Sequence, residues 1–279
     1  MLRVLAILCA VMLIPMVAGG NLGDLPDDLE RWIAVDPPEK GSEGWFAAND
    51  DVGHEWVVSL RDRHAHAQLR NHAVDRDTSL PFEIERSSAR DGLAGRRLAV
   101  KVADGWIVAF NAGEFGAGLW WFSPDGKKRY KISESWVSGF LETEVGLLAL
   151  EGLAHGGQSR GRIIRLSRDR EGRWQSADFV DLGHAPEAAA KRADGSLLVA
   201  TTDRLLKVVP SEKKVEVLCN DVFWGGLYPN SLVIAADGTA YLGMRHGVAK
   251  IQAKGGKWQV TWLLPNQDFV NMKSAKGFK

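Results

Sequence analysis

Two short stretches hold residue types and spacings that could do chemistry. "GQSRG", residues Gly157 to Gly161, has the G-x-S-x-G spacing of a hydrolase nucleophile, which needs a strand, a sharp turn and a helix. Here it lies in a glycine-rich corner followed by the strand-like "RIIRL", so that context is missing. "HAH" places His64 and His66 two residues apart, on one face of a strand, where both could bind one ion such as zinc. No cysteine or carboxylate at ligand spacing completes the set, and exposed strand histidines are the alternative interpretation.

The elements that would position these residues repeat along the chain. "YPNSLVIAADGTAYLGMRHGVAKI", beginning at Tyr228, reads as strand, tight turn, strand, polar corner and strand. The same order recurs in three upstream stretches, and more weakly in "WFAANDDVGHEWVVSLRDRHAHAQL". The turn glycines of the five copies are Gly53, Gly105, Gly146, Gly195 and Gly238.

Each unit closes with a fourth strand-like run, such as "KRYKI" or "WQVTWLL". Four short strands in a period of about 40 to 50 residues are typical of a β-propeller blade. No apolar stripe of helical period and helix length is visible. The sequence therefore predicts an all-β propeller of about five, or six, four-stranded blades, with residues 21–279 as one domain. Residues 21–43 and 265–279 fall outside the units, and either could add a strand that closes the ring.

The stretches "PNSLVIAADGTAYLG" and "PEAAAKRADGSLLVA" resemble the propeller group that includes NHL repeats, streptogramin lyases and the gluconolactonase/senescence-marker family. The resemblance implies the fold, because this pattern serves turn geometry. The gluconolactonase family holds a divalent cation, and its motifs match Glu43 and Asn230 in this chain. Arg245 follows where that family has an acidic ligand, and two oxygen ligands hold Ca²⁺ poorly. A Ca²⁺ or Zn²⁺ cofactor is thus left open, with none as the expectation.

Propeller geometry converts strand order into location. The loops that enter each innermost strand, and those between second and third strands, open on one face around the central channel; we call this the channel face. The first unit's corner would add Arg61, Asp62 and His64 to it. Aromatic, histidine and arginine side chains gather in these loops, as they do in recognition sites. The predicted ligand-binding residues are Trp136, His155, His184, Arg204, Trp224, Tyr228, Asn230, Arg245 and His246.

The N-terminus and the composition indicate the cellular location of the protein and the classes of partner it can bind. Residues 1–20 follow the pattern of a cleaved secretory signal peptide, with Arg3 before an apolar run and small residues at the end. A lipoprotein at Cys9 is the alternative, although Leu8 stands where a small residue is preferred. The mature chain then keeps Cys219 alone and has no internal disulfide. Lys and Arg together number 35, as do Asp and Glu, so no net field favours nucleic acid.

These patterns together favour a periplasmic or secreted, monomeric and non-catalytic propeller. Its expected partner is a protein, peptide or glycan of the cell envelope, bound at the channel face, and an inhibitor or immunity-type role is one form of this. The alternative is a metal-dependent hydrolase or lyase of the gluconolactonase or streptogramin-lyase type. The deciding feature is whether three or more acidic or amide side chains meet in the channel.

Overall fold

The computed structural model describes residues 25–71, 80–84 and 91–272. The predicted signal peptide, residues 1–20, and Cys9 lie outside these ranges. None of the described helices is long and apolar enough to cross a membrane.

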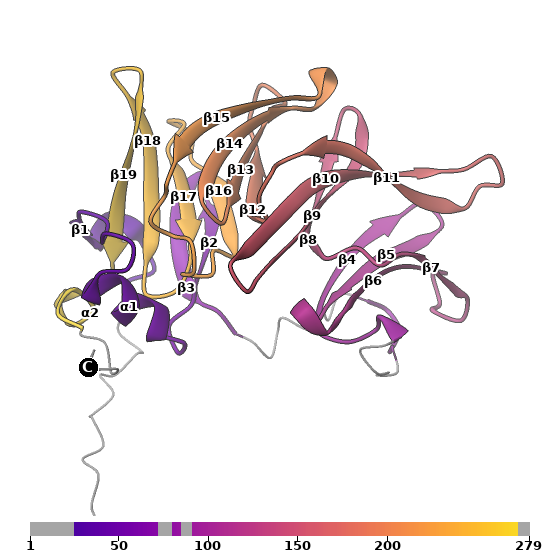
Figure 1. Cartoon of the computed structure of the whole chain (residues 1–279), viewed down its shortest axis with the longest axis horizontal. Helices are drawn as coiled ribbons and strands as arrows, with labels where there is room; N and C mark the ends of the chain where they lie inside the picture. The colour runs from indigo at the N-terminus through magenta and orange to yellow at the C-terminus, as the bar shows by residue number, and fades with distance from the viewer. Residues whose placement is uncertain (1–24, 72–79, 85–90, 273–279) are drawn as a thin grey trace, which may run out of the picture.

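Four antiparallel sheets of four consecutive strands match the last four predicted units (Figure 1). Blade 2 consists of β4 (Arg96–Val102), β5 (Gly105–Asn111), β6 (Ala117–Phe122) and β7 (Arg129–Ser133). Blade 3 consists of β8 (Val137–Thr143), β9 (Gly146–His155), β10 (Gln158–Arg168) and β11 (Trp174–Asp181). Blade 4 consists of β12 (Pro186–Lys191), β13 (Leu197–Thr201), β14 (Arg204–Val209) and β15 (Lys214–Asn220). Blade 5 consists of β16 (Ser231–Ile234), β17 (Ala240–Gly243), β18 (Val248–Lys254) and β19 (Lys257–Leu264).

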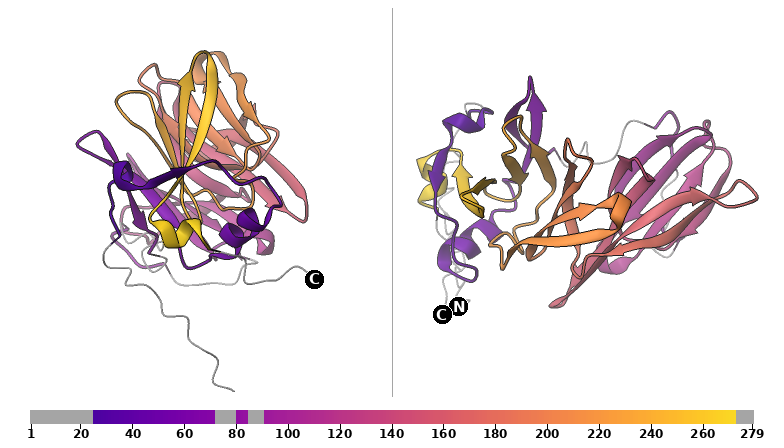
Figure 2. Two further views of the ribbon diagram at one scale, coloured as in Figure 1. Left: turned by 90° about the vertical axis from the view of Figure 1, so that its left-hand side faces the viewer. Right: turned by 90° about the horizontal axis from the view of Figure 1, so that it is seen from above.

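The blades are arranged with their first strands innermost. β8 contacts β4 on one side and β12 on the other, β12 contacts β16, and β16 contacts β2 (Trp56–Arg61). The sheets fan out from this inner row in two further views (Figure 2). Apolar side chains of neighbouring blades pack between the sheets, as Leu119 and Ile107 of blade 2 do with Ile164 of blade 3. The all-β propeller prediction is confirmed.

The first unit differs from the other four. It supplies a two-stranded hairpin, β2 with β3 (His64–Leu69), and the expected strand before it is the helix α1 (Glu43–Asp50). Ser42 caps this helix by accepting a hydrogen bond from the Trp45 backbone N–H at 3.3 Å. Ala47 and Ala48 then bury one side of a segment that lacks strand alternation. The sequence shows no helical stripe here because a cap and two alanines favour a helix that is too short to show one.

An N-terminal strand completes the sheet of the last blade. β1 (Ile33–Val35) pairs antiparallel with β19, placing Ile33 opposite Leu264 and Val35 opposite Trp262. The short helix α2 (Gln267–Val270) follows β19. A strand added from residues 21–43 was predicted, and β1 is that strand. One-turn 3-10 helices complete the elements: η2 (Leu29–Arg31), η4 (Gly113–Phe115) and η5 (Pro210–Glu212).

The turn glycines show why the repeat was visible in the sequence. Gly105, Gly146, Gly195 and Gly238 all have positive φ; the first two begin the second strand of their blades and the other two lie just before it. At Gly105 a Cβ atom would collide with the carbonyl oxygen of Phe122 on the neighbouring strand. Gly53 lies between α1 and β2 and is no strand turn, as expected of a unit without a first strand.

Candidate functional site

The channel face carries most of the predicted binding residues. The connections on it are 112–116, 134–136, 156–157, 182–185, 202–203, 221–230 and 244–247, which enter innermost strands or join second to third strands. α1 lies on this face because Trp45 Nε1 donates to the carbonyl oxygen of Phe223 at 2.8 Å and Asn49 Nδ2 donates to that of Gly226. Figure 1 shows α1 and α2 on the same side of the molecule.

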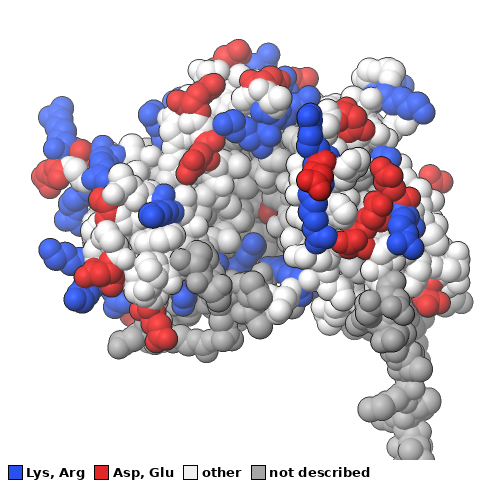
Figure 3. Space-filling model, turned by 180° about the vertical axis from the view of Figure 1, so that it is seen from behind, with Lys and Arg blue, Asp and Glu red and all other residues white. Residues whose placement is uncertain are grey.

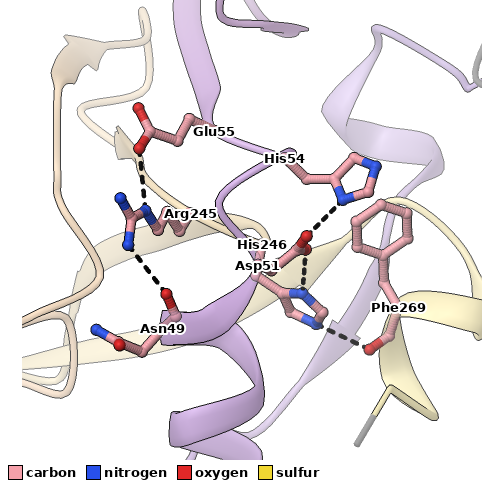
Figure 4. Close-up of polar contacts among 7 residues, drawn as sticks. All are labelled: Asn49, Asp51, His54, Glu55, Arg245, His246 and Phe269. Atoms are coloured by element: carbon pink, nitrogen blue, oxygen red, sulfur yellow. Dashed lines mark hydrogen bonds and ion pairs between the residues drawn. The ribbon is translucent and has the colours of Figure 1, made fainter. Parts of the chain in front are cut away.

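A polar cluster joins α1 to the last blade (Figure 4). The carboxylate of Asp51, at the end of α1, lies 2.6 Å from His54 Nδ1 and 2.8 Å from His246 Nδ1. His246 Nε2 donates to the carbonyl oxygen of Phe269 in α2 at 2.9 Å, because a carbonyl can only accept. Asp51 and His246 together thus link the end of α1, the corner between β17 and β18, and α2.

Burial and pairing act in opposite directions on this cluster. Burial raises the pKa of Asp51, but the hydrogen bonds from His246 and His54 outweigh it, so the pKa of Asp51 is lowered. The hydrogen bond to Asp51 raises the pKa of His54 against the effect of burial. The bond at Nδ1 also orients the His54 ring, whose side chain is partly exposed. His54 and Asp51 were not among the predicted residues, since no local pattern links them to His246.

Arg245 supports an exposed aromatic ring beside this cluster. Its Nε donates to Glu55 Oε1 at 3.0 Å and its Nη1 donates to the carbonyl oxygen of Asn49 at 3.0 Å. The other oxygen of Glu55 accepts from Arg70 at 2.9 Å. The Arg245 guanidinium lies 3.8 Å from the ring centroid of Tyr228, a cation–π contact. Tyr228 is 52% exposed and has a φ of +54°, which is strained for a bulky residue and is a feature of functional loops.

Two predicted binding residues are buried instead. Trp224 is fully enclosed, and its Nε1 donates to the carbonyl oxygen of Thr201 between blades. His246 is buried between Asp51 and Phe269. Both side chains pack beneath the channel face and do not reach its surface, so the prediction that they contact a ligand is corrected. Trp224 reaches inward to the Thr201 carbonyl, and His246 reaches inward to the buried Asp51.

The other predicted residues form separate groups around the face. His155 Nδ1 lies 2.7 Å from Glu114 Oε2, next to Phe115, which is 73% exposed. His184 Nδ1 lies 3.2 Å from Asp203 Oδ1, next to Arg204. Trp136 Nε1 donates to the carbonyl oxygen of Gly113 at 2.8 Å, and Arg160 lies over its ring at 5.5 Å.

The candidate metal ligands are placed as follows. Glu43 is exposed in the first turn of α1. Asn230 Oδ1 accepts from the Ser231 hydroxyl at 2.8 Å, and its buried Nδ2 has no hydrogen-bond partner among the described residues. Within the described ranges, no group of three or more His, Cys, Asp or Glu side chains could hold a metal ion.

His64 and His66 lie on β3, where His66 Nδ1 is 3.6 Å from Asp27 Oδ2 and His64 pairs in register with Arg61. β2 begins at the channel face, since the Trp56 backbone N–H donates to the carbonyl oxygen of Met244. Its far end, with Arg61, Asp62 and His64, therefore lies on the opposite face, and the expected placement of this corner is wrong because α1 replaces the first strand.

One titratable group in the inner row of strands was not anticipated. Burial in β12 raises the pKa of Glu187 to about 7, and the positive charge of Arg96 in β4 only partly offsets this. The only sequence signal was a lone carboxylate inside the strand "PEAAAK".

Seen from behind, the molecule is hollowed between its two halves, and acidic and basic side chains are interspersed over its surface (Figure 3). No single sign of charge dominates this view, in agreement with the neutral sequence.

Comparisons with known proteins find partial matches among solved structures. No family model matches the chain, and no curated protein matches it. Among solved structures, a virginiamycin B lyase from Staphylococcus aureus matches at 11% identity and a TM-score of 0.37, over 58% of this chain and 53% of that one. A putative gluconolactonase matches at 17% identity and a TM-score of 0.38, over 60% of this chain and 67% of that one. An auxiliary nutrient binding protein from Bacteroides ovatus matches at 11% identity and a TM-score of 0.41, over 61% of this chain and 40% of that one.

The match to the lyase covers about half of that protein's length. The fold-level resemblance to the streptogramin-lyase and gluconolactonase group holds, and it extends to the fold alone.

Proposed function

We propose that this protein is a non-catalytic binding module of the cell envelope that recognises a protein partner through its channel face. One observation carries the proposal. Five large apolar or aromatic side chains are exposed in the described residues, and two of them lie in channel-face connections: Phe115 at 73% and Tyr228 at 52%. A third, Val52 at 63%, lies between α1 and the start of β2, which are both at this face. Protein interfaces are anchored by such residues, Tyr and Arg above all.

The surroundings of these anchors favour binding over chemistry. Tyr228 is presented by a strained backbone and lies over an arginine that Glu55 and Asn49 hold in place. A side chain that is ordered before binding loses little conformational entropy on association. The histidines nearest to Tyr228 are engaged with Asp51 and Phe269, so they act as supports for the loops.

The test is capture of partners from envelope extract by the immobilised protein, with paired variants. We expect that Tyr228→Ala and Phe115→Ala each reduce the yield of a partner about tenfold or more, the effect of losing one hot-spot residue. Val217→Ala is the matched control, because Val217 is also exposed but lies on the outer strand β15. Equal loss with the control, or retention by both channel-face variants, contradicts the proposal.

A metal titration separates this proposal from the hydrolase or lyase alternative. Ca²⁺ or Zn²⁺ added to metal-free protein is expected to leave Tm within about 1 °C, because the described residues hold no group of three or more His, Cys, Asp or Glu side chains that could bind an ion. A stoichiometric ion with a rise of several degrees would favour the enzymatic alternative, and lactone and lyase assays would follow.

A further inference from the structure

A cleft lies between blades 2 and 3, apart from the Tyr228 region. It has a volume of about 760 Å³, which is within the range of small-molecule sites. Its walls come from the connection between β7 and β8 on one side and from β10 and β11 on the other. The residues used below are Glu134, Trp136, Glu151, Arg160, Arg162 and Asp178.

The floor of the cleft holds a fixed guanidinium. Arg162 Nε lies 2.8 Å from Oε2 of the buried Glu151, and its Nη1 donates to Asp178 Oδ2 at 3.0 Å. Glu151 and Asp178 thus hold the Arg162 guanidinium in place and balance its charge.

The mouth of the cleft holds a second guanidinium. Arg160 stacks over Trp136, whose indole N–H is bonded to the carbonyl oxygen of Gly113, so the ring that supports the arginine is itself held in place. No carboxylate pairs with Arg160 in the described ranges. Arg160 and Arg162 lie on the same face of β10, two residues apart. Because Glu151 and Asp178 already hold Arg162, Arg160 is the guanidinium that offers donors to an anion at the mouth of the cleft.

Carboxylates dominate the rest of the rim. Asp178 is 74% exposed and Glu134 is 79% exposed, so each keeps free acceptor oxygens beside its partner, Arg162 or Lys131. A ligand that is anionic at one end and cationic at the other would match this distribution of charge.

We propose that this cleft is a second binding site, for a short zwitterionic peptide whose carboxylate pairs with Arg160 and whose ammonium group lies near Glu134 and Asp178. A peptide of a few residues fits the volume, and its backbone amides match the polar walls. The proposal does not depend on the protein partner of the channel face, since Tyr228 and Phe115 do not line this cleft.

Isothermal titration of the purified protein with the tripeptide Ala-Ala-Ala, free at both termini, tests the site. We expect saturable binding that weakens at least about tenfold in Arg160→Ala, the loss of one charge-assisted hydrogen bond. Arg160→Lys should recover part of the affinity, because it keeps the charge. Arg170→Ala is the matched control, since Arg170 is exposed in the turn of the same β10–β11 hairpin.

Blocked peptides separate the two ends of the ligand. The C-terminally amidated tripeptide should lose binding through the arginine end, and the N-acetylated tripeptide should lose it through the carboxylate end. Absence of saturable binding by the free tripeptide, or equal affinity in Arg160→Ala and wild type, would overturn the site. Equal affinity for the N-acetylated and free peptides would overturn the zwitterionic assignment.

Discussion

His246 and Asp51 are 195 residues apart in the chain, and their Nδ1 and Oδ2 atoms are 2.8 Å apart in the fold. The pair connects the corner between β17 and β18 to the end of α1, and the second nitrogen of His246 extends the connection to α2. The helix that replaces a strand of the first unit is therefore fastened to the last blade by a buried polar contact.

Asp51→Asn should destabilise the protein in a defined pH window. The lowered pKa of Asp51 gives stability that is present above its unfolded value of 3.8 and lost as the pH falls through the folded value. The raised pKa of His54 gives stability that is complete below its unfolded value of 6.5 and lost as the pH rises through the folded value. Urea unfolding should show the largest difference from wild type between about pH 4 and 6.5. A difference that does not vary with pH would contradict this.

Glu187→Gln should stabilise the protein in alkaline solution only. With a folded pKa of about 7, raised from 4.5, the wild type binds a proton on folding and loses stability as the pH rises between these values. After a discount for partial exposure, we expect a gain of about 2 kcal/mol for the variant at pH 8 and little change at pH 4.5. The comparison needs unfolding curves of both proteins at these two pH values. A gain at pH 4.5 of the same size would point to packing instead of charge.

Glu55→Gln should be far more damaging than a similar change at the surface. Glu55 is buried and pairs with both Arg245 and Arg70, so the variant removes a negative charge that two largely buried guanidinium groups contact. We expect a loss of about 3 kcal/mol in the free energy of unfolding. Glu134→Gln, which affects an exposed pair with Lys131, should cost less than about 1 kcal/mol. If the two variants lose the same free energy of unfolding in chemical denaturation, the buried Glu55 pairs contribute no more stability than an exposed pair.

Alanine variants of two glycines with positive φ can distinguish the cost of backbone strain from the cost of a steric collision. Gly156→Ala meets open space, so only its φ of +58° opposes the change, at about 1 kcal/mol. Gly105→Ala adds a collision with the backbone of β6, for a total of about 2 to 4 kcal/mol. Thermal unfolding of the two variants measures the difference, and a Gly105 variant no less stable than its Gly156 counterpart would rule out the proposed collision.

The sequence predicts the blades well because their signals are local. Strand alternation and a turn residue such as Gly195 act within a few neighbours, and so the strands of blades 2 to 5 follow their predicted order. α1 was missed because eight residues are too few for a helical stripe, and its cap at Ser42 is the only strong mark.

The candidate site was only partly predictable, for a physical reason. Tyr228 and Arg245 share one repeat, so their meeting on the channel face follows from blade geometry. Asp51, His54 and Glu55 reach this region only because α1 changes the path of the first unit. The raised pKa of Glu187 depends on burial by neighbouring blades, and no pattern within β12 encodes it.

The pairing of β1 with β19 also bears on the order of assembly. About 230 residues separate the two strands, so their contact closes a very long loop, which is slow to form compared with the local hairpins. During synthesis β1 emerges early and then has no partner until the last blade has been made. A strand exposed for that time is open to pairing with other chains, and its length of only three residues limits this hazard. The last sheet therefore gains its fifth strand only after both ends of the chain have been made.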